Sequence, residues 1–306
     1  MINEAQHVEA FAARCPCGNK SGLSIQQDKI PFTGKNEKQL ESFMNFDFSG
    51  CVAIVTGGAG GIGTATVDRL LKSGAKVAAF DRDQTRLEQL KAGKGDELSI
   101  HQVDVSNLDQ IEQAVAAVEK AFGRIDMLIS VAGGGTPTTI DSASADDWNR
   151  VVGLNLSGPF YGIKAVAPAM RRVGGGSIVT VGSLAAFQMS FNNGVSYTAA
   201  KSGVLGLTRH AAFELARDNI RVNAVLPGPI MTPQMDAKID AKSRADVPRR
   251  VPMGRWLSPE EVAAPILFFC SDAARACTGT HVIVDGGLHV GAQYDTETYF
   301  AKRKSS

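Results

Sequence analysis

The chain has 306 residues, 44% of them hydrophobic, which is enough for one large or two small domains with a buried core. Thirty-two Lys and Arg residues nearly balance 31 Asp and Glu residues, so the net charge of +1 argues against a nucleic-acid partner. No apolar run approaches the roughly 20 residues of a membrane-spanning helix, and no secretory signal pattern is present. We therefore expect a cytoplasmic protein without a membrane partner.

Residues 1–44 contain isolated apolar residues with no period of 2 or 3.6, which predicts an N-terminal extension outside the core. Cys15 and Cys17 lack the second pair of Cys or His ligands that a structural zinc site needs, so we predict no metal site. Met44 starts a segment that leads directly into the first strand. We therefore hypothesise that Met44 is the initiator, which the intact mass of protein made from its native gene would test.

From Cys51 onward, short apolar runs alternate with amphipathic stretches, as in βα units that build a parallel sheet. Strands are expected at 51–56, 76–80, 98–103, 127–131, 177–181, 221–226 and 281–284. Helices are expected at 64–73, 84–91, 108–122, 146–172, 197–217 and 259–271. This pattern predicts one α/β domain over 45–290, a doubly wound sheet of about seven strands with helices on both faces. A polar, Pro-containing substrate loop spans 230–257, and 291–306 forms a tail.

A glycine cluster follows the first strand and opens the first helix. Gly57, Gly61, Ile62 and Gly63 lie where backbone N–H groups can approach a pyrophosphate, whose charge the helix N-terminus favours. The alternative is a Gly-rich turn without a ligand. The position between a strand and a helix favours the dinucleotide site.

The second strand ends at Asp81, about 20 residues beyond the glycines, where a carboxylate can bind both ribose hydroxyls and repel a 2′-phosphate. We therefore predict NAD over NADP. Arg82 follows and can pair with a phosphate, unless it is only a solvated surface residue. Asp104, at the end of the third strand, is positioned to reach the adenine or to cap the next helix.

Tyr197 and Lys201 are four residues apart on a predicted helix, so their side chains share one face. A nearby ammonium favours the phenolate and is expected to lower the pKa of Tyr197 toward neutrality, where a tyrosine acts as general acid and base. The alternative for the pair alone is an ordinary surface helix.

Several motifs in a fixed order resemble the short-chain dehydrogenase/reductase family over residues 50 to about 288. They are Thr56-Gly57-x-x-x-Gly61-Ile62-Gly63, Asp104-Val105, Asn155, Ser183, Tyr197-x-x-x-Lys201, Pro227-Gly228 and the closing run 278–287. The resemblance implies a Rossmann-type fold and an oxidoreductase that is a homotetramer or homodimer.

The resemblance also implies roles. Tyr197 exchanges the proton with the substrate oxygen, Lys201 lowers the tyrosine pKa and holds the nicotinamide ribose, and Ser183 binds the reacting oxygen. Asn155 holds a water that relays protons from Lys201. Without Tyr197 and Lys201, Ser183 would be read as a turn residue and Asn155 as a helix-interior amide.

Further positions matching the family's cofactor site are Val105, Ala132, Gly133, Pro227, Gly228, Ile230 and Thr232. Thr232 resembles the residue that holds the carboxamide, although a loop threonine is often only a turn former. One departure is the run Ser130-Val131-Ala132-Gly133, where relatives commonly have Asn-Asn-Ala-Gly. The missing second Asn puts in doubt how the fourth strand is braced.

The expected substrate is a secondary alcohol or ketone with a largely apolar skeleton, including cyclic or aromatic ones, because the segment after Ser183 and much of the 230–257 loop are apolar. One alternative is an NADPH-dependent ketoreductase, for example on a 3-oxoacyl thioester. Another is a non-catalytic dinucleotide-binding regulatory protein.

Overall fold

The computed structural model describes residues 46–190, 192–237, 239–291 and 296. Seven strands form one parallel sheet in the order β3-β2-β1-β4-β5-β6-β7, which confirms the predicted fold class. The strands are β1 (Val52–Thr56), β2 (Lys76–Asp81), β3 (Leu98–Gln102), β4 (Met127–Ser130), β5 (Gly176–Val181), β6 (Ile220–Pro227) and β7 (His281–Val284). The predicted extension 1–44 and nearly all of the predicted tail 291–306 lie outside the described residues.

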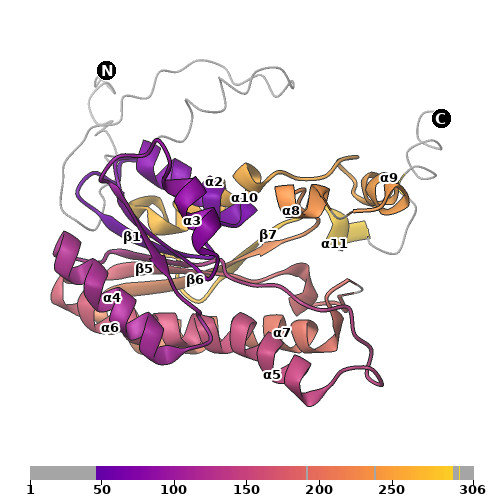
Figure 1. Ribbon diagram of the computed structural model, residues 1–306, viewed down its shortest axis with the longest axis horizontal. Coiled ribbons are helices and arrows are strands. Elements are labelled where there is room, and N and C mark those ends of the chain that lie inside the picture. Colours follow the sequence, from indigo (N-terminus) through magenta and orange to yellow (C-terminus); the bar gives the residue numbers. More distant parts are fainter. Residues whose placement is uncertain (1–45, 191, 238, 292–295, 297–306) are drawn as a thin grey trace, which may run out of the picture.

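Helices cover both faces of the sheet (Figure 1). On one face lie α2 (Gly61–Lys72), α3 (Gln84–Lys91) and α10 (Pro259–Cys270). On the other lie α4 (Leu108–Phe122), α5 (Ala145–Val152), α6 (Gly158–Arg172) and α7 (Gly194–Leu215). Three short helices follow the carboxyl ends of β6 and β7: α8 (Pro233–Asp236), α9 (Ala241–Arg250) and α11 (Leu288–Gly291). Single 3₁₀ turns lie at Leu184–Ala186, Ala216–Asp218 and Asp272–Ala274.

Alternate residues of the central strand β1 enter two separate cores. Ala53 and Val55 pack in the cluster that includes α2 and α10, whereas Val52 and Ile54 pack in the cluster that includes α4 and α6. All of β1 is buried because helices cover both of its faces. The strand order reverses between β1 and β4, so a crevice forms at their carboxyl ends, where doubly wound sheets bind ligands.

The single helix predicted over 146–172 is instead interrupted by a π-helical turn at Gly153–Ser157. Asn155 lies within this turn and is fully buried. Its Nδ2 donates to the carbonyl oxygens of Val151 and Gly134, at 2.8 and 2.7 Å. The wider turn therefore lets a helix residue reach the loop after β4, which apolar periodicity could not reveal.

Two local details could not be read from the sequence. The polar segment 230–257 contains short helices, where Thr232 and Asp240 cap α8 and α9 by accepting hydrogen bonds from backbone N–H groups. Asn107 caps α4, whereas Asp104 accepts hydrogen bonds from Ser106. In both places a side chain that caps the first turn sets where the helix begins.

Within the described part of the chain, no helix is long and apolar enough to span a membrane. The same residues contain no group of three or more His, Cys, Asp or Glu side chains able to hold a metal ion.

Candidate functional site

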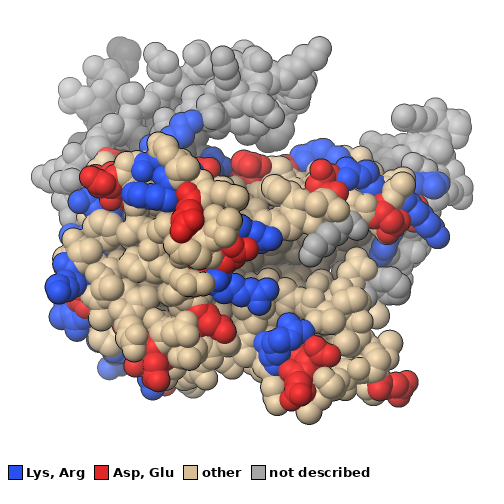
Figure 2. All heavy atoms as spheres, in the orientation of Figure 1, with Lys and Arg blue, Asp and Glu red and all other residues tan. Residues whose placement is uncertain are grey.

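A cavity of about 400 Å³ opens at the carboxyl ends of β1, β2, β3 and β4. The space-filling view shows this face hollowed between α8 and α5, with Lys and Arg side chains at the rim (Figure 2). The residues predicted to bind the cofactor that line it are Gly57, Gly61, Ile62, Gly63, Asp81, Arg82, Asp104, Val105, Ala132, Gly133 and Thr232.

The glycines of the first loop are required by close backbone approaches. A Cβ on Gly63 would lie 2.0 Å from the carbonyl oxygen of Gly57, which itself has φ of +66°. A Cβ on Gly61 would lie 2.7 Å from the Cβ of Thr232. Any side chain here would therefore displace the loop or the wall of the cavity facing it.

The N-terminus of α2 faces the cavity with its amide groups uncapped. Gly60, at the N-cap, provides no side-chain hydrogen bond, and the first turn has no acidic residue. Uncapped N–H groups and the positive end of the helix dipole suit an anion. A dinucleotide pyrophosphate fits this donor set.

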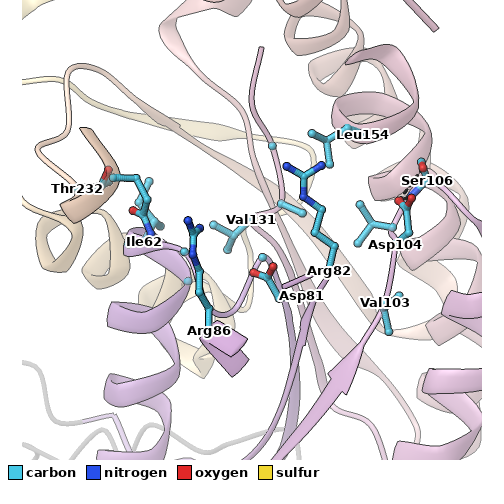
Figure 3. A pocket seen from close by; sticks show the side chains of 18 of the residues that line it. Ile62, Asp81, Arg82, Arg86, Val103, Asp104, Ser106, Val131, Leu154 and Thr232 are labelled. Carbon is cyan, nitrogen blue, oxygen red and sulfur yellow. Dashed lines mark hydrogen bonds between the residues drawn. The ribbon is translucent and has the colours of Figure 1, made fainter. Parts of the chain in front are cut away.

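Asp81 lies at the rim between Arg82 and Arg86 (Figure 3). Its Oδ2 accepts a hydrogen bond from the N–H of Ala59 at 3.2 Å, and its Oδ1 accepts one from Asp83 at 3.1 Å. These bonds fix the carboxylate against the glycine loop.

The four predicted catalytic residues form a second group that does not line the cavity. Gly133, which does line it, connects the two groups. A Cβ on Gly133 would lie 2.9 Å from Oδ1 of Asn155 and 3.2 Å from Nζ of Lys201. The loop after β4 thus passes directly over both side chains.

Tyr197 and Lys201 share one face of α7, as predicted. Lys201 is buried, and burial lowers the pKa of its ammonium to about 8. Nζ donates to the carbonyl oxygen of Val181 at 2.8 Å and lies 5.5 Å from the centroid of the Tyr197 ring. With a pKa of about 8, the lysine is mainly the protonated ammonium at pH 7 and loses its proton a little above it.

Burial raises the pKa of Tyr197, and a hydrogen bond with the side chain of Ser183 opposes this rise. Burial outweighs this hydrogen bond because desolvation disfavours the phenolate. The role of Lys201 in lowering the tyrosine pKa stays a prediction. Ser183 begins the 3₁₀ turn after β5, where its Oγ accepts the N–H of Ala185 at 3.1 Å.

Besides Tyr197 and Lys201, three predicted cofactor residues do not line the cavity. Pro227 ends β6, and Ile230 forms a parallel bridge with Leu257. A Cβ on Gly228 would lie 2.6 Å from the Cβ of Asp285, so only a glycine lets the residue after β7 pack this closely. These contacts join the end of β6 to β7 and to the 230–257 segment.

Several residues that line the cavity were not predicted from the sequence: Gly60, Arg86, Val103, Ser106, Val131, Arg150, Leu154 and Gln234. Arg150 and Leu154 are four apart on one helical face next to Asn155, so helical spacing could have indicated both. Arg86 follows the capping residue Asp83 by three positions, a weaker signal.

The fourth strand stays paired despite the departure in the run that follows it. β4 keeps its parallel pairing with β1 and β5, so the sheet is intact. Ser130, however, is buried, and its Oγ has no hydrogen-bond partner among the described residues.

Comparisons with known proteins agree with this geometry. Residues 57–289 match the family model described as Enoyl-(Acyl carrier protein) reductase. The chain is 39% identical to the 3-oxoacyl-[acyl-carrier-protein] reductase FabG of Thermotoga maritima, covering 78% of this chain and 98% of that protein. It is 36% identical to trans-4-hydroxycyclohexanecarboxylate dehydrogenase of Sinomonas cyclohexanicum, with coverage of 78% and 93%.

A crystal structure titled short-chain dehydrogenase/reductase SDR: glucose/ribitol dehydrogenase, from Brucella melitensis, superposes with a TM-score of 0.75. It is 34% identical and covers 80% of this chain and 99% of its own. The ordered motifs, the parallel sheet and these matches lead to one conclusion: the chain belongs to the short-chain dehydrogenase/reductase family of oxidoreductases.

Proposed function

We propose that the protein transfers a hydride between NAD(H) and a secondary alcohol or ketone of largely apolar skeleton, including cyclic or aromatic ones. The observation that carries this proposal is the convergence of Asn155 and Lys201 on Gly133. Gly133 lines the dinucleotide cavity, so the proton-handling side chains lie next to the space for the nicotinamide.

The dinucleotide supplies the hydride chemistry when bound. The glycine loop and the N-terminus of α2 hold its pyrophosphate, and Asp81 holds the adenosine ribose. Thr232, opposite Gly61, is placed to contact the nicotinamide end. Because Asp81 is a carboxylate, NAD is the preferred form.

Tyr197 exchanges a proton with the substrate oxygen, and Ser183 donates a hydrogen bond to that oxygen. The raised pKa keeps the phenol of Tyr197 protonated near neutrality, which suits donation to a carbonyl. Lys201, with a pKa of about 8, releases a proton toward Tyr197 and regains one, while Asn155 orders the loop above it.

An apolar substrate is supported by the side chains around Ser183. Phe187 and Met189 are 59% and 70% exposed just beyond it, and Met253 of the substrate loop is 65% exposed. Leu184 and Ala185, in the apolar segment after Ser183, are buried. A relative that acts on a hydroxycyclohexane ring is consistent with this class.

The test is absorbance of the reduced nicotinamide with a panel of cyclic alcohols, polyols and acyl thioesters, using NAD and NADP separately. Cyclic or aromatic alcohols are expected to give the highest kcat/KM. Clearly better turnover of polyols would reject the substrate class. Turnover of 3-oxoacyl thioesters with NADPH would instead support the alternative, which the 39% identity to a 3-oxoacyl reductase favours.

A homo-oligomer is part of the proposal, because Phe160 on α6 and Phe213 on α7 expose apolar rings, the latter to 86%. Light scattering after gel filtration is expected to give the mass of a dimer or tetramer. Phe213→Glu is expected to lower that mass by weakening the contact between subunits. The cytoplasmic location and the 45–290 domain bounds stay predictions.

A further inference from the structure

Asp285 and His289 form a side-chain pair just beyond the end of β7. Nδ1 of His289 lies 2.8 Å from Oδ2 of Asp285, whose side chain is 3% exposed, whereas the imidazole is 44% exposed. A second His–carboxylate pair at the same spacing, His210 with Glu214 on α7, is exposed on both sides, at 75% and 64%. Burial of the carboxylate therefore distinguishes the Asp285–His289 pair from an ordinary surface contact.

The carboxylate of Asp285 fixes where the imidazole carries its proton. It accepts the backbone N–H groups of Gly287 at 2.9 Å and of His289 at 2.7 Å, in addition to the ring. An ionised carboxylate has no hydrogen to donate, so Nδ1 must carry the proton that joins the pair. In the neutral ring, Nε2 then presents a lone pair and acts as an acceptor. Among the described residues, none forms a hydrogen bond with Nε2.

Two glycines between the members of the pair fold the chain back against the substrate loop. Gly286 and Gly287 have φ of +64° and +87°, which side-chain-bearing residues rarely adopt. A Cβ on Gly286 would lie 2.7 Å from Cγ1 of Val251, and its carbonyl oxygen accepts the N–H of Met253 at 3.2 Å. The turn therefore packs directly against the end of the substrate loop, which follows α9 (Figure 1).

The pair also adjoins the loop that carries Ser183. Strands β5, β6 and β7 are adjacent and parallel, so their carboxyl ends share one edge of the sheet. A Cβ on Gly228 would lie 2.6 Å from Cβ of Asp285 and 3.5 Å from Cδ1 of Leu184, the residue after Ser183. The pair thus lies between the Ser183 loop and the substrate loop, the two segments between which the proposed function places the substrate.

We propose that His289, held by Asp285, is a specificity-determining residue whose Nε2 accepts a hydrogen bond from a second hydroxyl group of the substrate. The substrate class is then a cyclic or aromatic alcohol that carries a further hydroxyl away from the reacting carbon. Exposed apolar side chains such as Phe187 supply contact area, and one oriented polar group fixes how the ring lies. This inference rests on the proposed function, because it requires the reacting oxygen to lie at Ser183.

The experiment is steady-state kinetics with NAD, comparing cyclohexanol with the positional isomers of cyclohexanediol on the full chain and on His289→Phe. In the unmodified protein, at least one diol is expected to exceed cyclohexanol about tenfold in kcat/KM. His289→Phe keeps an apolar ring but removes the acceptor, so it should abolish this preference and change cyclohexanol turnover less than about twofold. His289→Gln, whose Oε1 also accepts hydrogen bonds, should recover part of the preference. Val290→Ala, on the same short helix and 78% exposed, is the matched control and should keep it.

A purely structural role for the pair gives a different result. Equal loss of cyclohexanol and diol turnover in His289→Phe overturns the inference, as does a diol preference that survives the substitution. His289→Ala provides the same comparison should the phenylalanine variant not fold. A preference for hydroxycyclohexanecarboxylate over every diol that depends on His289 would indicate an imidazolium that binds an anion, and would overturn the hydroxyl assignment. These outcomes leave the proposed function intact, whereas failure of the unmodified protein to oxidise any of these alcohols or to reduce cyclohexanone would reject it.

Discussion

The ammonium of Lys201 donates a 2.8 Å hydrogen bond to the carbonyl oxygen of Val181, the last residue of β5. A buried cation with one backbone acceptor is poorly solvated, which explains why its pKa falls to about 8. The same burial raises the pKa of Tyr197. The two pKa values therefore lie further apart than they would in water, with the lysine titrating first.

Lys201→Met is expected to change how stability depends on pH. Because folding lowers the pKa of Lys201 from 10.5 to about 8, the unfolded chain binds a proton between these values that the folded chain does not. The unmodified protein should therefore gain up to about 3 kcal/mol relative to the variant as pH rises from 8 to 10.5. Urea unfolding at pH 7, 9 and 10.5 measures this difference. A constant difference would show that the lysine is not perturbed.

Tyr197→Phe is expected to lower kcat by about 10² to 10⁴, because the phenol is the only proton donor proposed to contact the substrate oxygen. NADH affinity should change less than about threefold, since the ring remains in place. Steady-state rates and fluorescence titration give both quantities. Retained turnover would indicate another acid, and an unchanged biological role without turnover would support a regulatory protein.

Ser183→Ala removes the hydrogen bond that opposes the rise in the pKa of Tyr197. The pKa of Tyr197 should rise further, so the acidic limb of the pH profile for alcohol oxidation, which requires the deprotonated phenol, should shift to higher pH. Loss of one donor to the reacting oxygen should also lower kcat by about 10². Ser142→Ala, in an exposed loop, provides the control and should leave the profile unchanged.

Gly63→Ala is expected to abolish dinucleotide binding, because its Cβ would lie 2.0 Å from the carbonyl oxygen of Gly57. The loop must move, and with it the amides of α2. Gly95→Ala is the matched control, since nothing lies within 4 Å of a Cβ there. Calorimetric titration with NAD compares the two, and near-normal binding by Gly63→Ala would contradict the assigned loop.

Ser130→Ala is expected to stabilise the fold by about 1 kcal/mol, because the buried Oγ has no partner among the described residues. Ser177→Ala makes the opposite comparison. The Oγ of Ser177 donates to the carbonyl oxygen of Phe269 at 2.8 Å, so loss of this hydrogen bond should lower the stability of the fold. Thermal unfolding of both variants measures the effect, and destabilisation by Ser130→Ala would reveal a partner such as a buried water.

The sequence by itself determined the seven strands, most of the helices and the glycine loop. These depend on local features: runs that are apolar on both faces, helical spacing, and a turn that only glycine permits. It also determined that Tyr197 and Lys201 share one side of α7, since that follows from helix geometry alone.

Only the tertiary structure decided the remaining features. Arg86 borders the dinucleotide cavity because α3 packs beside the glycine loop, and Gly133 meets Asn155 because a π-helical turn shifts the register of the helix. The pKa of Tyr197 rises because surrounding elements exclude water from it. Burial and long-range approach are collective properties of the packed chain, so no local pattern of residues encodes them.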